Sequence, residues 1–213
     1  MLQEKGTLFV ISAPSGAGKN SLLHEVLTGN DQLKLAISHT TRLPRPGESE
    51  GKSYYFIDED VFKHLIEEGN FIEYAKVHGH YYGTSKQEIQ GKLDNGQNLL
   101  LEIDVQGAKQ IKEKFPDAVL IYILPSFDRP IKILRERLQL RKTNHPLDIE
   151  TRLRNAQQEL KQAVNYDYVV VNDDFNTAKA DLQCIFRVQA LTVGRNKEVL
   201  KKVFCLLYTS PSP

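Results

Sequence analysis

The clearest chemical pattern in the chain is a run of small residues between an apolar segment and a lysine. Residues 9–12 are followed by Gly16 and Gly18, and Lys19 comes next. Glycines in such a turn let backbone N–H groups point at an anion, the N-terminus of the next helix adds positive charge, and the lysine reaches the outer phosphates. We therefore predict a phosphate-binding loop made of Ala13, Pro14, Ser15, Gly16, Ala17, Gly18, Lys19, Asn20 and Ser21.

This loop departs from the pattern G-x-x-x-x-G-K-[ST] at two positions. Ala13 replaces the first glycine, and Asn20 stands where a hydroxyl residue usually holds magnesium. An amide oxygen can serve Mg²⁺, but its reach and angle differ from those of a hydroxyl, and Mg²⁺ demands a strict octahedron. We expect weakened Mg²⁺ dependence and reduced turnover, with nucleotide binding kept. The alternative is a glycine-rich turn that binds nothing.

Two acidic residues follow a second apolar segment. Glu102 and Asp104 come directly after residues 99–101, which are all leucine. Proteins with this kind of phosphate loop place an acidic residue near magnesium at the end of such a strand. We therefore predict Asn20 and Glu102 as the magnesium ligands. The alternative for one of the two carboxylates is that it caps the following helix.

Two arginines lie close together on a loop that prolines stiffen. Arg42 and Arg45 are three residues apart, and Pro44 and Pro46 exclude a helix or a central strand there. A guanidinium group grips phosphate oxygens through two hydrogen bonds, so this loop suits a monophosphate. A solvated surface turn is the alternative.

The composition and charge of the chain limit its predicted partners and location. The chain has 213 residues, a formal net charge of +1, 40% hydrophobic and 26% charged residues, as is ordinary for a globular protein. We predict no nucleic-acid partner and no membrane partner, because the charge is nearly balanced and no apolar run approaches about 20 residues. Cys184 and Cys205 show no metal-binding spacing, and with no signal-like N-terminus the predicted location is the cytoplasm.

Apolar runs alternate with helical patterns along the chain, which predicts an α/β fold with a central parallel sheet. The 39–84 block has antiparallel-type signals and looks inserted. The predicted strands are 7–12, 33–38, 71–77, 98–103, 118–124 and 168–171, with a turn over 79–84. The predicted helices are 21–27, 58–68, 85–95 (capped by Ser85, with Glu88 completing the capping box), 105–115, 128–140, 148–164 and a long one over 176–204.

Several segments in a fixed order resemble guanylate kinases, the bacterial form in particular. They are A-P-S-G-A-G-K at 13–19, S-H-T-T-R at 38–42 with P-R-x-G-E at 44–48, Y-Y-F at 54–56, F-I-E at 71–73, Y-Y-G-T-S at 81–85, E-I-D-V-Q-G-A at 102–108 and V-N-D-D at 171–174. The resemblance covers about residues 6–204. It implies a P-loop three-layer fold with a mixed-β GMP-binding subdomain and a helical lid, and transfer of phosphate from ATP to GMP, and to dGMP, with Mg²⁺ in nucleotide salvage. The oligomeric state stays open.

The resemblance also implies roles for individual residues. Guanine presents two N–H donors beside the O6 acceptor, so a carboxylate at Glu73 would accept from both donors while Ser38 and Thr84 supply hydroxyls. The implied GMP-binding residues are Ser38, Arg42, Arg45, Tyr54, Glu73, Tyr82, Gly83, Thr84, Glu102 and Asp104. Asn172 matches the position beside the adenine of ATP. The implied catalytic residues are Lys19, Arg45, Arg141 and Arg152.

The resemblance divides the chain into a core of residues 1–38 and 85–204, a GMP-binding subdomain of 39–84 and a lid at about 138–152 within the core. Lys142 and residues 144–146 depart from the usual lid turn, and Glu102 replaces the more common aspartate. Arg135 and Arg137 have a solvated helix face as their alternative. Residues 205–213 resemble a translated sequencing adapter, and we expect them to be a non-native tail.

Two other functions are compatible with the same segments. One is a guanylate-kinase-like interaction module that binds protein ligands with weak or no catalysis. Such modules are expected to lose the phosphate loop and its lysine, and Gly16, Gly18 and Lys19 are present here. The other is a related P-loop kinase acting on a different phosphorylated small molecule. Glu73 with Ser38 and Thr84 favours guanine over that alternative.

Overall fold

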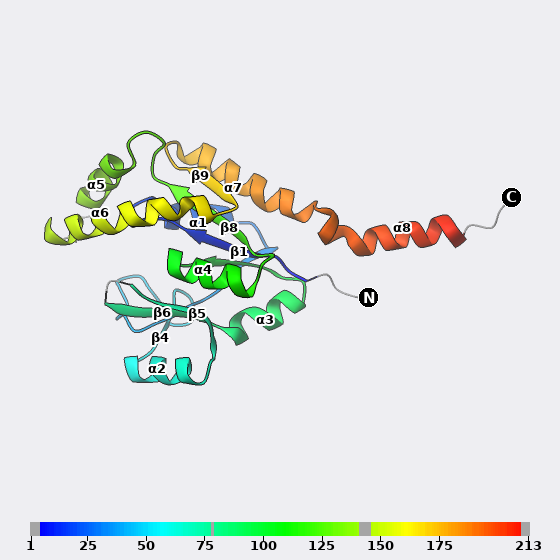
Figure 1. Ribbon diagram of the computed structural model, residues 1–213, viewed down its shortest axis with the longest axis horizontal. Coiled ribbons are helices and arrows are strands. Elements are labelled where there is room, and N and C mark those ends of the chain that lie inside the picture. Colours follow the sequence, from blue (N-terminus) through cyan, green and yellow to red (C-terminus); the bar gives the residue numbers. More distant parts are fainter. Residues whose placement is uncertain (1–4, 78, 141–145, 210–213) are drawn as a thin grey trace.

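The computed structural model describes residues 5–77, 79–140 and 146–209, and its centre is a parallel sheet (Figure 1). Five strands lie in the order β2-β7-β1-β8-β9 and all neighbours are parallel. This confirms the predicted α/β class with a parallel sheet. The strands are β1 (Leu8–Ser12), β2 (Leu33–Leu35), β7 (Asn98–Glu102), β8 (Val119–Leu124) and β9 (Tyr168–Val171).

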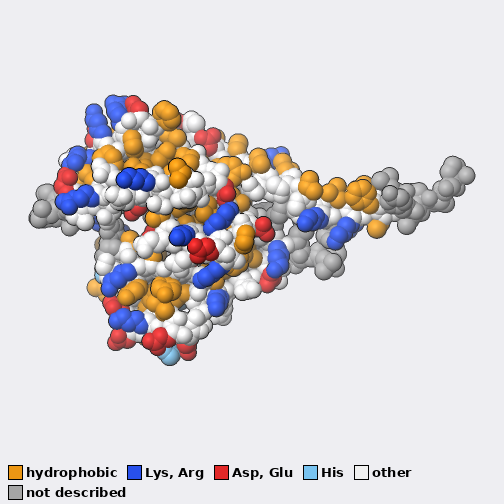
Figure 2. Space-filling view, in the orientation of Figure 1, with side chains coloured by type: hydrophobic (Ala, Val, Ile, Leu, Met, Phe, Trp, Pro, Cys, Tyr) orange, Lys and Arg blue, Asp and Glu red, His pale blue; other side chains and the backbone are white. Residues whose placement is uncertain are grey.

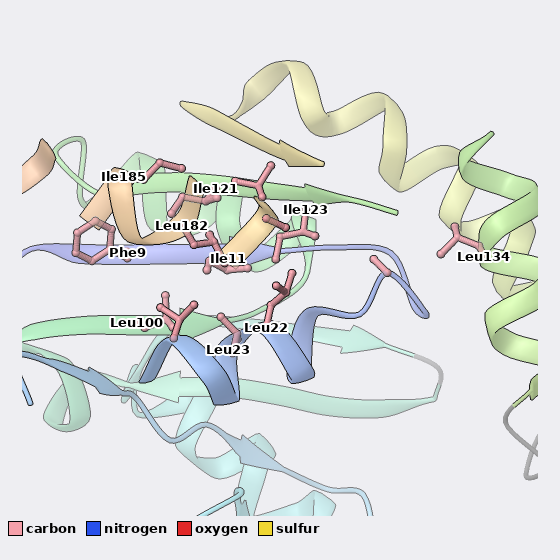
Figure 3. Close-up of a cluster of buried hydrophobic side chains, with 14 of the residues drawn as sticks. Phe9, Ile11, Leu22, Leu23, Leu100, Ile121, Ile123, Leu134, Leu182 and Ile185 are labelled. Atoms are coloured by element: carbon pink, nitrogen blue, oxygen red, sulfur yellow. The ribbon is translucent and has the colours of Figure 1, made fainter. Parts of the chain in front are cut away.

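Helices cover both faces of this sheet because each buried strand has apolar residues on both sides. In β1, Phe9 and Ile11 pack with α1 (Lys19–Leu27) and α7 (Phe175–Ala190) in one cluster (Figure 3). Leu8 and Val10 pack on the other face with α3 (Lys86–Asp94) and α4 (Val105–Lys114). The result is a three-layer sandwich. Loops at the carboxyl ends of its strands form one edge of the molecule, where α/β proteins bind ligands.

A second, mixed sheet stands beside this edge. Its order is β4-β3-β6-β5, with β3 parallel to β4 and antiparallel to β6. The strands are β3 (His39–Thr40), β4 (Tyr55–Phe56), β5 (Phe71–Val77) and β6 (His80–Ser85). Helix α2 (Glu59–Glu67) covers it through Phe62, whose ring stacks on Phe71 and Tyr81.

Two helices, α5 (Pro130–Leu140) and α6 (Pro146–Leu160), pack against each other at the phosphate-loop end of the parallel sheet. Leu134 and Leu138 of α5 and Leu153 of α6 are buried in the same cluster as Phe9. A 3₁₀ turn, η1 (Lys161–Asn165), connects α6 to β9. These helices were predicted as 128–140 and 148–164, so their existence was right; α5 ends where predicted, and the other three ends were displaced by two to four residues.

The turn predicted over 79–84 is wrong. Gly79, with φ +87°, lies in the turn, and β6 begins at the next residue because residues 80–85 pair with β5 on one side while Tyr82 and Gly83 pair with β3 on the other. The predicted strand 33–38 is also too long, since β2 ends at Leu35. Ser85 caps α3 as expected, but Glu88 bonds to the Ile37 N–H and Lys92, so the capping box is half formed.

The single C-terminal helix predicted over 176–204 is also wrong. Helix α7 ends at Ala190, Thr192 is extended, and a 3₁₀ turn, η2 (Val193–Asn196), leads into α8 (Lys197–Thr209). Helix α8 projects from the body (Figure 1), and hydrophobic side chains lie along it (Figure 2), among them the exposed Leu200, Val203 and Phe204. Residues 205–209 of the expected tail continue this helix, and residues 210–213 lie outside the described part. Within the described residues, no helix combines the length and apolarity needed to cross a bilayer.

Candidate active site

A cavity of about 250 Å³ opens between the carboxyl edge of the parallel sheet and the mixed sheet. One end is lined by the loop after β1 and the other by the buried end of β5. Most of the side chains predicted from the sequence meet here. Its lining includes residues 13–20 of the phosphate loop, Ser38, Arg45, Tyr54, Glu73, Tyr82, Glu102, Asp104 and Glu159.

The phosphate loop has the backbone that its glycines predicted. Gly16 and Gly18 have φ values of +98° and +88°, in the left-handed region that residues with a Cβ rarely adopt. Gly18 is the N-cap of α1, so the helix N-terminus faces the loop. Lys19 is the first residue of α1, and Asn20 and Ser21 are exposed beside it. The loop therefore presents backbone donors and the helix end together.

Lys19 is paired with the acidic end of β7. Its Nζ lies 3.2 Å from Glu102 Oε1, and the two side chains are 17% and 23% exposed. β1 and β7 are neighbours, with Ile11 opposite Glu102, so strand pairing brings the two charges together at one edge. An anion that draws Lys19 away would release Glu102 for another cation.

Arg137 and Asn172 hold the phosphate loop from behind. The Arg137 guanidinium donates to the Ala17 carbonyl at 3.0 Å and to the Asn172 carbonyl at 3.0 Å. The Asn172 amide donates to the same Ala17 carbonyl at 2.7 Å. The solvated-face alternative for Arg137 is therefore wrong, because α5 turns this side chain inward. Asn172 is buried at 4% exposure, and in this structure its amide is used on the loop.

Glu73 is a buried carboxylate at the far end of the cavity. It is 2% exposed, Oε1 accepts a 2.6 Å hydrogen bond from Thr84 Oγ1, and Thr84 Oγ1 lies 3.0 Å from Ser38 Oγ. The three residues predicted to read a base are thus one hydrogen-bonded chain. The pKa of Glu73 is raised to about 7, chiefly because the side chain is buried; the hydrogen bond from Thr84 opposes this shift and the nearby Asp104 adds to it.

This shift predicts a pH-dependent stability. The ordinary carboxyl pKa is 4.5, so between pH 4.5 and 7 the folded protein holds a proton that the unfolded chain releases, and stability falls as pH rises through this window. From pH 5 to 8, the wild-type free energy of unfolding should fall by roughly 2 kcal/mol relative to Glu73→Gln. Denaturant melts at several pH values measure it. Glu113→Gln, at an exposed position of α4, is the control, and parallel curves for wild type and Glu73→Gln would contradict the expectation.

Asp104 caps a helix, as the alternative for one of the two acidic residues proposed. It is the N-cap of α4, and Oδ1 accepts from the Gly107 N–H at 2.9 Å while Oδ2 accepts from Gln106 at 3.0 Å. Asp104 also lines the cavity. Glu102 pairs with Lys19 instead, so the two carboxylates have different partners.

The arginine loop is held by its own glutamate. Arg42 forms a bidentate pair with Glu48 at 2.9 Å, donates to the Tyr82 hydroxyl at 3.3 Å and stands 5.5 Å from the Tyr54 ring centroid. Glu48 also accepts from the Arg45 N–H at 2.7 Å. The Arg45 side chain is exposed and lines the cavity. Arg45 is therefore available to an anion, whereas Arg42 is engaged.

Tyr54 and Tyr82 stand together in this wall of the cavity, with ring centroids 5.9 Å apart. Burial raises the pKa of the Tyr54 phenol, so its hydroxyl stays a donor at neutral pH. Gly83, on the neighbouring strand β6, also has a packing role. A Cβ there would meet Phe62 Cζ at 2.9 Å, so this glycine permits close packing of α2 on β6.

Helix α6 reaches the phosphate loop through Arg152. Its Nη1 lies 3.5 Å from Ser15 Oγ, at the limit of a hydrogen bond. Arg141, with the unusual residues 142–145 of the predicted lid turn, lies outside the described residues.

Glu159, which lines the cavity from α6, was not predicted from the sequence. The pKa of Glu159 is raised to about 7, chiefly by burial and also by the nearby Asp104, while Lys19 opposes the shift. It lies seven residues after Arg152, two helical turns along the same face, so helical spacing could have drawn attention to it.

Comparison with known proteins decides among the phosphate-loop families. A family model described as guanylate kinase matches residues 5–189. The chain belongs to the guanylate kinase family. Curated guanylate kinases include relatives from Thiobacillus denitrificans, 47% identical over 89% of this chain and 90% of that protein, and from Alkalilimnicola ehrlichii, 44% identical over 92% and 95%.

A solved structure agrees with this assignment. The crystal structure of guanylate kinase from Anaplasma phagocytophilum matches with a TM-score of 0.74 and 32% identity, covering 95% of this chain and 97% of that one. The predicted P-loop fold and the predicted guanylate kinase enzyme are confirmed. The family assignment also speaks against the other phosphate-loop kinases considered above.

Proposed function

We propose that this chain transfers the terminal phosphoryl group of ATP to GMP, giving ADP and GDP, with dGMP as a second acceptor and nucleotide salvage as its role. The observation that carries the proposal is that one cavity joins a phosphate loop at one end to a buried carboxylate at the other. Guanine matches Glu73 because its two adjacent N–H donors can share one carboxylate, whereas adenine would leave that carboxylate unpaired.

Phosphoryl transfer needs positioning, charge neutralisation and exclusion of water more than covalent chemistry. The loop N–H groups and Lys19 bind the ATP phosphates, and Arg45, Tyr54 and Tyr82 bind the GMP phosphate. Arg152, and Arg141 by the family resemblance, stabilise the charge on the transferring group. Glu73 and Asp104 fix the guanine end, so the acceptor oxygen is presented to the loop. Residues 39–84 act as the GMP-binding subdomain, and about 138–152 as the lid.

The residues at the loop fit a magnesium ion held jointly with phosphates. Mg²⁺ is bound in kinases through one or two protein oxygens, with phosphates and water completing its shell. Asn20 and Glu102 line the same cavity, and among the described residues no cluster of three or more His, Cys, Asp or Glu could hold a metal alone. These two residues would hold it, and the ion would neutralise charge on the phosphates.

A nucleotide panel tests the proposed function. ADP release is measured with ATP·Mg²⁺ and GMP, dGMP, AMP or ribose 5-phosphate, on the full chain and on a chain ending at residue 204. We expect turnover with GMP and dGMP alone, at equal rates for the two chains. Turnover with AMP or ribose 5-phosphate in place of GMP would contradict the choice of substrate, and absence of all turnover would favour the interaction-module alternative.

Asn20→Ser should improve magnesium use. A hydroxyl restores the usual ligand at this position, so we expect the half-saturating Mg²⁺ concentration to fall by roughly tenfold, the lower end of what a disturbed ligand shell costs, with higher kcat. Steady-state rates against Mg²⁺ concentration measure both. Asn176→Ser, the same chemical change at an exposed position of α7, is the control. Unchanged rate and metal requirement in Asn20→Ser would show that asparagine serves as well as serine.

A further inference from the structure

Helix α4 approaches the Glu73 carboxylate closely at Gly107. A Cβ built at Gly107 would lie 2.5 Å from Glu73 Oε2 and 3.3 Å from Glu73 Cδ. Real Cβ atoms essentially never come under 3.0 Å of another heavy atom. Any residue other than glycine must therefore displace the carboxylate or the helix.

The backbone does not explain a glycine at this position. Gly107 lies in the first turn of α4, and its φ is not positive. Alanine is the better helix former there. The Gly107 N–H donates to Asp104 Oδ1. This hydrogen bond caps helix α4 and does not position the Glu73 carboxylate. The steric room beside Glu73 is what the glycine provides.

The other side of the carboxylate is already fixed. Glu73 Oε1 accepts from Thr84 Oγ1 at 2.6 Å, and Thr84 Oγ1 lies 3.0 Å from Ser38 Oγ. Because Glu73 Oε1 is bonded to these hydroxyls, a small shift of Oε2 alone cannot relieve the clash with a Cβ at residue 107. The carboxyl group must rotate or leave the hydroxyl chain, and both change the direction of its lone pairs.

We propose that Gly107 is a specificity-determining position for the nucleobase, because its missing side chain leaves the space in which the Glu73 carboxylate faces guanine. The proposal rests on the proposed function, in which Glu73 reads the base. Gly107 acts through Glu73 and is a positioning residue. Its substitution should therefore affect GMP and leave ATP alone.

The test compares two helical glycines in the full chain. Gly107→Ala places a methyl group against Glu73, whereas Gly91→Ala in α3 meets nothing within 4 Å. We expect Gly107→Ala to melt within a few degrees of wild type, to lose on the order of 10²-fold in kcat/KM for GMP, and to keep its KM for ATP. Gly91→Ala should keep all three values.

A second variant separates positioning from packing, because the Cβ would also lie 3.3 Å from Ile103 Cδ1. Glu73→Asp withdraws the carboxylate by one methylene, so the double variant Gly107→Ala/Glu73→Asp should have a higher kcat/KM for GMP than Gly107→Ala alone. A role in packing against Ile103 predicts no such recovery.

Each outcome bears on one claim. If wild type fails to phosphorylate GMP, the proposed function falls. If wild type uses GMP and folded Gly107→Ala keeps its kcat/KM within threefold, only the inference on Gly107 is overturned. Unfolding of Gly107→Ala, or absence of recovery in the double variant, would also overturn it, because either result means that the glycine serves helix packing.

Discussion

Glu73→Gln should lower kcat/KM for GMP by roughly 10⁴-fold while the affinity for ATP stays within a few fold. A site built to hydrogen-bond particular groups rejects a mismatched partner by this factor, because buried polar groups are left unpaired. The glutamine amide keeps the shape of the carboxyl group but replaces one acceptor by a donor. That donor would oppose a guanine N–H, and neither could reach water at a side chain that is 2% exposed.

The measurement is steady-state kinetics with each nucleotide varied in turn, together with calorimetric binding of a non-hydrolysable ATP analogue. Glu113→Gln, on the exposed side of α4, is the matched control, since it makes the same chemical change away from the cavity. Equal losses for both nucleotides would mean that Glu73 supports the fold of the cavity as a whole. Unchanged GMP turnover would mean that another group reads the base.

Local patterns predicted the phosphate loop and the layers around it. An apolar run, then glycines, then Lys19 predicts a strand, a turn and a helix in that order. The local backbone conformation therefore places the loop N–H groups and Lys19 together. The runs 99–101 and 119–123 are apolar at every position, as expected for strands covered on both faces. These features depend on neighbouring residues, and the structure confirms them.

The contacts that hold the site together could not be predicted, because they join segments that are far apart in the sequence. Arg137 and Asn172 reach the Ala17 carbonyl across 120 and 155 residues of sequence. A charged residue on an amphipathic helix looks the same whether it faces water or a buried carbonyl. The Glu73 carboxylate likewise lies close to Gly107, in a helix 34 positions further along the chain.

The single helix predicted over 176–204 was wrong for a different reason. The helical periodicity of the sequence continues across the point where the chain bends between α7 and α8. Residues 191–196 have no proline, and the apolar spacing persists from one helix to the next. Thr192 nevertheless adopts ψ 147° and stops α7. Among the described residues, helix α8 packs mainly on η2, so packing on the body does little to keep the two helices in one line.

Arg152→Met should reduce kcat by roughly 10³-fold or more, the range attributed to an arginine that stabilises a transferring phosphoryl group. The side chain already reaches the loop, with Nη1 3.5 Å from Ser15 Oγ, and its helix is anchored by the buried Leu153 and Ala156. Because the arginine acts most strongly on the developing charge, KM for ATP and for GMP should change far less than kcat.

Single-turnover kinetics measure the phosphoryl-transfer step directly, and Arg154→Met is the matched control because Arg154 is exposed on the same helix. Arg152→Lys should recover little of the lost rate, since an ammonium group lacks the planar fork that grips two phosphate oxygens. If Arg154→Met lost as much as Arg152→Met, the effect would belong to the net charge of the helix. If Arg152→Met kept its rate within tenfold, the charge on the phosphoryl group would be carried by Lys19, Arg45 and the rest of the lid.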